Sequence, residues 1–274
     1  MGEQKLHNAI DETFSAIEPT LSERIRSHVS LLPTLKQFAH ERENILLDLK
    51  EHSVLSGGKP AYFELWGVLE KHRLPTAQHC ERVAGYVRLM GSYLDPLVEG
   101  NASLQHASRL HDIGKLLIPE YLLKKKELSS FHRMLVVEGH AVLGEFLCKY
   151  LGIDDPSVRN PIVYHHDVKD GYPHNLDKAQ SILDDGTQRV IASDMQDSLV
   201  IGDLLSFADS ADAIVDPSRT YQQHLTPRAA FERLTDITHK RGIFPQRYLD
   251  ALDKVLLNHA EEVDEMYSKC QFDI

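Results

Sequence analysis

Hydrophobic residues recur at helical spacing through the N-terminal part of the chain. The first stripe consists of Leu6, Ile10, Phe14 and Ile17. Side chains three or four residues apart lie on one face of an α-helix, so the pattern predicts three or four helices. It stops at residues 55–60, where two adjacent glycines and a proline disfavour helix. We therefore predict a small helical N-terminal domain over residues 1–57.

The same periodicity continues after the break. It predicts helices around residues 62–71, 77–93, 103–112, 130–151, 156–166, 202–215, 227–241 and 245–267. Two of them begin with a capping residue and a proline, Asp155-Pro156 and Thr226-Pro227, which is typical of helix N-termini. Residues 181–191 differ, because two short β-prone runs flank an Asp-Gly turn. The chain is thus predicted to be all-α, with a second domain over residues 58–274 and a short β-hairpin inserted in it.

Composition and charge exclude several classes of protein. The 274 residues include 41 acidic and 30 basic side chains, and the formal charge of -11 would repel a long nucleic acid. The three cysteines lie far apart without a CxxC pair, so they support neither a disulfide framework nor a thiolate zinc site. No targeting signal is visible, and charges interrupt every apolar stretch before the ~18 residues of a membrane span. We expect a cytoplasmic protein that binds neither membranes nor long nucleic acids.

Histidine is the most unusual feature of the composition, with 16 residues in 274 against a usual share of about 2%. Four histidine features lie on predicted helices or at their ends: His79, His111-Asp112, His140 and His165-His166. Successive features are 25 to 32 residues apart, which is the length of one helix and one connection. Each helix of a bundle can therefore send one ligand to the same interior point. The spacing predicts a metal site inside a helical bundle.

The types of donor indicate which metals would bind. Imidazole and carboxylate groups without thiolate suit Fe, Mn, Co, Ni or Zn better than Ca or Mg. Five imidazoles with one or two carboxylates exceed the four ligands of a closed structural zinc site, whereas two ions that share a carboxylate would use them all. Asp112 is the natural bridge. We therefore expect two divalent transition-metal ions.

The ordered set of motifs closely resembles the ligand set of the HD superfamily of metal-dependent phosphohydrolases. The matching residues are His79, His111-Asp112-Ile113-Gly114-Lys115, His140, His165-His166 and Ala208-Asp209-Ser210-Ala211-Asp212-Ala213. Two further motifs resemble the HD-GYP branch, whose members hydrolyse cyclic di-GMP. They are Asp170-Gly171-Tyr172-Pro173 and Arg219-Thr220-Tyr221. The resemblance implies an HD-type helical bundle from about Glu64 to Leu252, and it does not reach the N-terminal helices.

The resemblance implies a role for each matching residue. The implied metal ligands are His79, His111, Asp112, His140, His165, His166 and Asp209, with Asp112 bridging two ions. Iron is the first choice of metal, and Mn, Ni, Co and Zn are alternatives. Lys115 would meet a phosphate oxygen or the leaving group, and Arg219 would be a second phosphate clamp, because a guanidinium can hold two oxygens at once. Tyr172 would line the guanine-binding side of the cleft.

These roles imply a phosphodiesterase that hydrolyses a cyclic dinucleotide, with cyclic di-GMP as the first candidate. Two cations would lower the pKa of a shared water, and the resulting hydroxide, bridging both ions, would attack phosphorus. Lys115 and Arg219 would stabilise the negative charge that builds on the phosphoryl group. Asp112 and Lys115 are therefore the expected catalytic residues.

The chain departs from the family pattern at three places. Trinuclear members carry a glutamate where this chain has Pro75, so we expect two ions and not three. The loop over residues 165–173 is about two residues shorter than in the family and lacks the family's extra glycine, although Gly171 is present. A second DxxD pattern begins at Asp194, which is an alternative to Asp209 as the last ligand. Asp209 is preferred because Arg219 follows it at nearly the family spacing.

Two other functions fit parts of the pattern. With its shortened GYP loop, the chain could bind a cyclic dinucleotide without hydrolysing it and act as a sensor. The histidine-rich shell also resembles HD-type di-iron oxygenases, although Lys115 and Arg219 favour a phosphate substrate. The N-terminal helices could form a homodimer, receive a signal from a partner, or simply cover the catalytic bundle.

Overall fold

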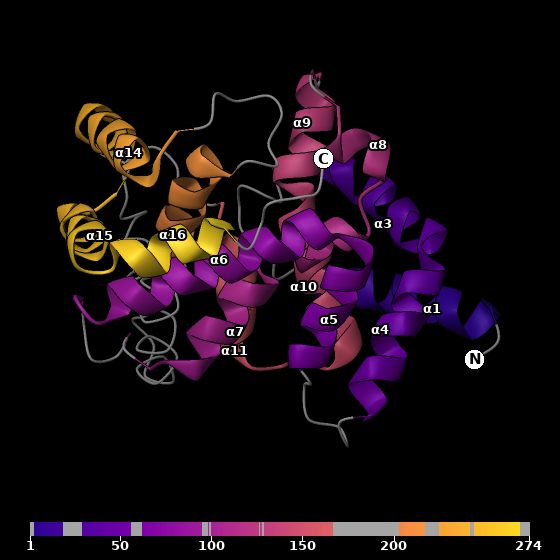
Figure 1. Ribbon diagram of the computed structural model, residues 1–274. Coiled ribbons are helices and arrows are strands. Elements are labelled where there is room, and N and C mark those ends of the chain that lie inside the picture. Colours follow the sequence, from indigo (N-terminus) through magenta and orange to yellow (C-terminus); the bar gives the residue numbers. More distant parts are fainter. Residues whose placement is uncertain are drawn as a thin grey trace, which may run out of the picture. The chain divides into compact units, whose positions relative to one another are not determined.

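The computed structural model describes residues 3–18, 29–55, 62–94, 98, 100–125, 127, 129–166, 203–216, 225–241 and 244–268. Within these residues every regular element is a helix and no strand occurs (Figure 1). The prediction of an all-α fold is therefore confirmed. None of the helices in this part of the chain has the length and apolarity needed to cross a bilayer. The predicted hairpin at residues 181–191 lies outside the described residues.

The chain divides into two compact units. The first unit comprises Met1–Ala77, Leu110–Asp155 and Ile162–His166. The second unit comprises Gln78–Arg109, Pro156–Pro161 and Asp167–Ile274. Three helices contribute residues to both units: α6 (Leu74–Gly91), α7 (Ala102–Leu110), of which only Leu110 belongs to the first unit, and α11 (Pro156–Tyr164). The predicted functional division, a regulatory segment 1–57 and a catalytic segment 58–274, stays a prediction.

The first unit is built around a buried helix, α10 (Gly139–Leu151). Its other elements are α1 (Glu3–Ile17), η2 (Val29–Leu31), α3 (Leu32–Glu41), α4 (Glu43–Leu55), α5 (Tyr62–His72), η3 (Ile113–Leu116), α8 (Glu120–Leu123) and α9 (Ser130–Val137). Every residue of α10 from Gly139 to Cys148 is buried, and α10 contacts α1, α4, α9 and η3. A helix that is enclosed on all sides forms the centre of its unit.

The hydrophobic stripes of the N-terminal helices face the same core as α10. Ile10 and Phe14 of α1 and Leu35 of α3 are buried. The ring of Phe14 stacks on that of Phe146 of α10, with centroids 4.6 Å apart. The burial of this apolar surface holds α1 and α3 in the first unit.

The short helix η3 lies unusually close to α10. A Cβ atom added to Gly114 of η3 would lie 1.9 Å from the carbonyl oxygen of His140 and 2.5 Å from the backbone nitrogen of Gly144. Backbone atoms cannot move aside as a flexible side chain can, so only glycine fits at position 114. This approach places Asp112, which immediately precedes η3, beside His140 at the beginning of α10.

The second unit has its own hydrophobic core. It contains most of α6, all of α7 (Ala102–Leu110) except Leu110, and the helix at residues 203–215. Its other helices are α14 (Pro227–Arg241), α15 (Gln246–Asn258) and α16 (Ala260–Ser268). Tyr86 of α6, Phe207, and Tyr248 of α15 are its largest fully buried side chains. Phe207 and Tyr248 pack with ring centroids 5.7 Å apart. This core joins α6, which carries His79, to the helix at residues 203–215, which carries Asp209.

Two of the predicted helices are interrupted. The helix predicted at residues 130–151 is divided at Glu138 into α9 and α10, and the one predicted at 245–267 is divided at His259 into α15 and α16. His259 has φ -128° and ψ 29°, outside the helical region. Its Nε2 atom lies 3.0 Å from the hydroxyl of Tyr93, which follows α6. A contact with a residue far away in sequence thus accompanies a bend that hydrophobic periodicity does not reveal.

Candidate metal centre

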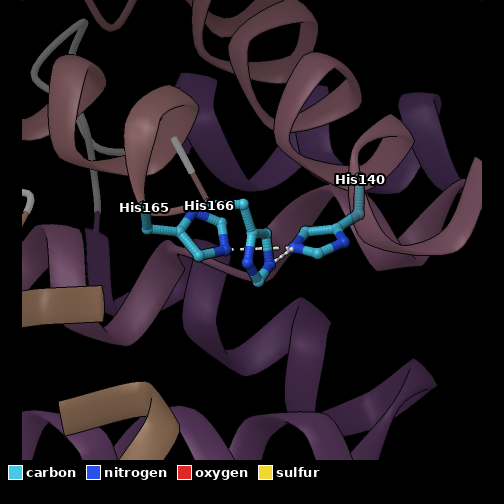
Figure 2. A group of neighbouring side chains, drawn as sticks. All are labelled: His140, His165 and His166. Carbon is cyan, nitrogen blue, oxygen red and sulfur yellow. Dashed lines mark hydrogen bonds between the residues drawn. The ribbon is translucent and has the colours of Figure 1, made fainter. Parts of the chain in front are cut away.

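Three imidazole rings converge in the first unit, as Figure 2 shows. The Nε2 atom of His140 lies 3.0 Å from Nε2 of His165 and 3.0 Å from Nε2 of His166. The same His140 nitrogen lies 3.1 Å from Oδ1 of Asp112. His140, His165 and Asp112 are buried, so the cluster is largely shielded from water.

In His140 and His165, a hydrogen bond made by Nδ1, the nitrogen that faces away from the cluster, determines which nitrogen carries the hydrogen. Nδ1 of His140 donates to the carbonyl oxygen of Val136, and Nδ1 of His165 donates to that of Ile162 at 2.7 Å. A carbonyl oxygen only accepts, so in each neutral ring the lone pair is on Nε2. Two lone pairs at 3.0 Å repel each other unless a cation lies between them.

The distances among these atoms fit a shared cation. Nitrogen ligands bind a transition metal at about 2.0–2.1 Å, so neighbouring ligands on one ion are about 2.9–3.4 Å apart. The Nε2 atoms of His140, His165 and His166 match that spacing. These three residues also form a group whose ligand atoms could hold one ion. The donor set therefore fits a divalent transition metal.

Asp112 supplies a carboxylate to this cluster. It has φ -95° and ψ 8°, in the sparsely populated bridge region where many active-site residues lie. Burial raises its pKa, but the Lys115 ammonium and, after it, the neighbouring imidazoles of His111 and His140 outweigh burial and hold the pKa well below the ordinary value. Asp112 is thus an anion at neutral pH.

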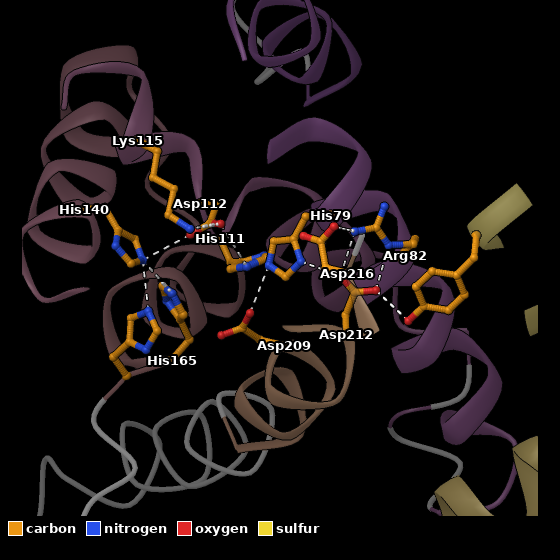
Figure 3. Close-up of polar contacts among 12 residues, drawn as sticks. His79, Arg82, His111, Asp112, Lys115, His140, His165, Asp209, Asp212 and Asp216 are labelled. Atoms are coloured by element: carbon orange, nitrogen blue, oxygen red, sulfur yellow. Dashed lines mark hydrogen bonds and ion pairs between the residues drawn. The ribbon is translucent and has the colours of Figure 1, made fainter. Parts of the chain in front are cut away.

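Lys115 and His111 complete the group in the first unit. Nζ of Lys115 donates to Oδ2 of Asp112, and the Lys115 side chain is 18% exposed (Figure 3). His111 is fully buried, with Nε2 3.7 Å from Oδ2 of Asp112. Its ring meets that of His165 edge to face, with centroids 5.0 Å apart. All five sequence-predicted ligands from positions 111 to 166 therefore lie together in one unit.

The other two predicted ligands lie together in the second unit. Nε2 of His79 is 2.9 Å from Oδ1 of Asp209 (Figure 3). Nδ1 of His79 is 2.6 Å from Oδ2 of Asp212, one helical turn after Asp209. Of the other sequence-predicted site residues, Tyr172, Arg219 and Asp194 lie outside the described residues.

Asp212 anchors His79 through a network that the sequence analysis did not identify. Arg82 donates from Nε to Oδ1 of Asp212 at 2.7 Å, and the Tyr267 hydroxyl donates to the same oxygen at 2.8 Å. Arg82 also pairs with Asp216 at 3.0 Å. A carboxylate on the second nitrogen of a histidine is the usual partner of a metal-binding imidazole, because it fixes the ring and its tautomer.

One sequence signal could have indicated this network. Arg82 is three residues after His79 on α6, and Asp212 and Asp216 follow Asp209 at three and seven residues. These spacings place each set on one face of its helix. Nothing in the spacing indicated that the face carrying Arg82 meets the face carrying Asp212.

The electrostatics of His79 and Asp212 are coupled. Burial lowers the pKa of His79, but hydrogen bonds to Asp209 and Asp212 outweigh burial and raise the pKa to about 9. Burial raises the pKa of Asp212, while the hydrogen bond from His79 and the charges of His79 and Arg82 lower it to about 2. Without a metal, His79 is therefore an imidazolium at neutral pH, and binding a metal through it would release a proton.

The metal-free protein should lose stability as the pH rises from 6.5 to about 9. Because the folded-state pKa of His79 is raised from 6.5, its contribution is complete below pH 6.5 and disappears as the pH passes about 9. This shift of the His79 pKa corresponds to about 3 kcal/mol in the free energy of unfolding. We expect the urea midpoint of chelator-treated protein to fall over this interval, and His79→Gln to remove most of the fall. The exposed His239→Gln is the control; a wild-type midpoint that stays constant would contradict the assignment.

The chain has recognisable sequence similarity to a known family and to a known protein. The model of the HD domain family matches residues 76–214, about half of the chain. The chain is 28% identical over 167 residues to 3'3'-cGAMP-specific phosphodiesterase 2 of Vibrio cholerae serotype O1. The aligned part is 60% of this chain and 31% of that protein, so the chain spans about a third of its relative's length. No solved structure matches the chain.

Proposed function

The chain belongs to the HD domain family, and from this premise we propose that it is a metal-dependent phosphodiesterase that hydrolyses a cyclic dinucleotide. One observation carries the proposal. Three imidazole nitrogens and the ionised Asp112 carboxylate converge at ligand spacing in a buried part of the first unit. A buried cluster of imidazole and carboxylate groups can bind the metal ions that activate water for hydrolysis.

The proposed metal ligands are the complete set that the sequence indicates. They are His79, His111, Asp112, His140, His165, His166 and Asp209, with Asp112 shared between two ions. Imidazole and carboxylate donors without thiolate suit Fe, Mn, Co, Ni or Zn. The resemblance of the motifs to the HD superfamily makes iron the first choice among them. When bound, the ions would supply the acidified water and the positive charge needed for attack on phosphorus.

Lys115 has the position expected of a phosphate-binding residue. Its ammonium lies against Oδ2 of Asp112, and part of the side chain remains exposed to solvent. A flexible ammonium here can turn from the carboxylate towards a phosphate oxygen or protonate a leaving oxygen. We propose the same clamping role for Arg219 and guanine contact for Tyr172.

The proposed substrate is a guanine-containing cyclic dinucleotide. The Asp170-Gly171-Tyr172-Pro173 and Arg219-Thr220-Tyr221 motifs make cyclic di-GMP the first candidate. The name of the Vibrio relative adds 3'3'-cGAMP, which shares a guanine and a cyclic phosphodiester ring with cyclic di-GMP. A site that recognises one guanine and two phosphates could therefore bind both cyclic di-GMP and 3'3'-cGAMP.

A direct assay tests the proposal. Protein purified without oxygen and loaded with iron or manganese should convert cyclic di-GMP or 3'3'-cGAMP into a linear dinucleotide or mononucleotides, separated by chromatography. Cyclic di-AMP, which has no guanine, is the control and should remain largely intact. If every cyclic dinucleotide is recovered unchanged, the enzymatic proposal fails, and tight binding without turnover would identify a sensor.

A further inference from the structure

A second group of potential metal ligands lies among the N-terminal helices, and it shares no residue with the proposed catalytic set. It consists of His7 on α1, His40 on α3 and Glu43 on α4, whose ligand atoms all lie within 4.8 Å of one another. The three residues come from three different helices of the first unit. One ion bound there would connect all three helices.

The tautomer of His40 points its lone pair into this group. Nε2 of His40 lies 3.2 Å from Oδ1 of Asp11, a hydrogen bond in which the ring must be the donor. The lone pair of the neutral ring is then on Nδ1, which is buried and has no hydrogen-bond partner in the described part of the chain. Leaving such an acceptor unsatisfied costs about 1–3 kcal/mol, so the site favours a cation.

Glu43 faces the same point with an unsatisfied oxygen. Its Oε1 atom is 4.0 Å from Nδ1 of His40 and 2.6 Å from Nδ1 of His7. This buried oxygen has no hydrogen-bond partner among the described residues. Its short contact with His7 is therefore an ion-pair contact without the geometry of a hydrogen bond. The His7 and His40 rings lie side by side, with centroids 4.3 Å apart and a tilt of 34°.

The surroundings of the group suit a borderline divalent cation. Asp11 holds the outer nitrogen of His40, the arrangement that orients metal-binding histidines, and Lys36 pairs with Asp11 at 2.9 Å. Two imidazoles and a carboxylate leave a fourth position for water, as tetrahedral zinc sites allow. His7 is 49% exposed, so an ion can enter from solvent.

We propose that His7, His40 and Glu43 form a second metal site, with Asp11 as the positioning carboxylate, that binds Zn²⁺ or a similar transition metal and joins α1, α3 and α4. Because α1 packs on α10 through Phe14 and Phe146, an ion here would stabilise the helices that cover the core of the first unit.

Zinc binding and thermal stability test this site without reference to turnover. Metal-stripped full-length protein is titrated with Zn²⁺, and bound zinc is counted after gel filtration. His7→Gln and Glu43→Gln should each bind one ion fewer than wild type and show a smaller rise of melting temperature with zinc. Asp11→Asn should bind this ion about tenfold more weakly. His239→Gln, an exposed histidine elsewhere, should match wild type.

The outcomes separate this proposal from the catalytic one. An equal zinc count and an equal zinc-induced stabilisation in wild type, His7→Gln and Glu43→Gln would overturn it, since the contacts would then be ordinary ion pairs. The variants leave every proposed catalytic ligand intact. Failure of cyclic dinucleotide hydrolysis would therefore not change the zinc count at this site, and loss of the site would not by itself abolish hydrolysis.

Discussion

Asp112→Asn should remove most of the bound metal and lower phosphodiesterase turnover on the order of 10³-fold. The structural reason is the charge of this side chain. Lys115, His111 and His140 keep the buried carboxylate ionised, and one of its oxygens lies 3.1 Å from Nε2 of His140. Asparagine preserves the shape but not the charge, so it is a poor replacement for a carboxylate proposed to be shared by two cations.

Metal content and turnover must be measured on the same preparation of the Asp112 variant. Metal is quantified after gel filtration, and hydrolysis is followed by chromatography under the conditions used for wild type. Asp253→Asn makes the same chemical change at an exposed ion pair with Arg228, so it should retain full metal content and turnover. A variant that kept both its metal and its activity would show that Asp112 is not a ligand.

Gly114→Ala should destabilise the protein by about 3 kcal/mol or more, although it adds only a methyl group. The new Cβ would lie 1.9 Å from the His140 carbonyl oxygen and 2.5 Å from the Gly144 nitrogen. To relieve this overlap η3 would have to move away from α10. That movement would separate Asp112 from His140, so metal affinity should fall together with stability.

Urea unfolding and zinc or manganese titration check the Gly114 prediction. Gly67→Ala is the matched control, because Gly67 lies within α5 and an added Cβ there has no atom within 4 Å. Alanine has the better helix propensity, so Gly67→Ala should stabilise the protein by about 0.5–1 kcal/mol. If Gly114→Ala instead unfolds at the wild-type urea concentration, the close approach of η3 to α10 is not a feature of the folded protein.

Most helices of the fold could be predicted from the spacing of hydrophobic residues along the chain. The stripe that includes Ile10 and Phe14 predicted a helix with a buried face, and α1 has that face. The interruptions of two predicted helices at Glu138 and His259 could not be predicted from this spacing. At His259 the interruption coincides with a hydrogen bond to Tyr93, a residue separated from it by most of the second unit's sequence.

The sequence predicted which residues belong to the candidate site, but it did not predict how their side chains are arranged. The order of His111-Asp112, His140 and His165-His166 indicated ligands of one centre, and the structure places them together in the first unit. The spacing did not identify Asp212, Arg82 and Tyr267 around His79. Nor did it identify the group formed by His7, His40 and Glu43.

The amino-acid sequence by itself determined the all-helical class and the chemical nature of the donors, because helical periodicity and residue type act over a few neighbouring positions. The tertiary structure alone decided which nitrogen of each imidazole faces its neighbours, and which carboxylates orient the rings. Those features depend on atoms brought together from positions as far apart as 79 and 212. Only the packed backbone, as at Gly114 against α10, fixes such distances.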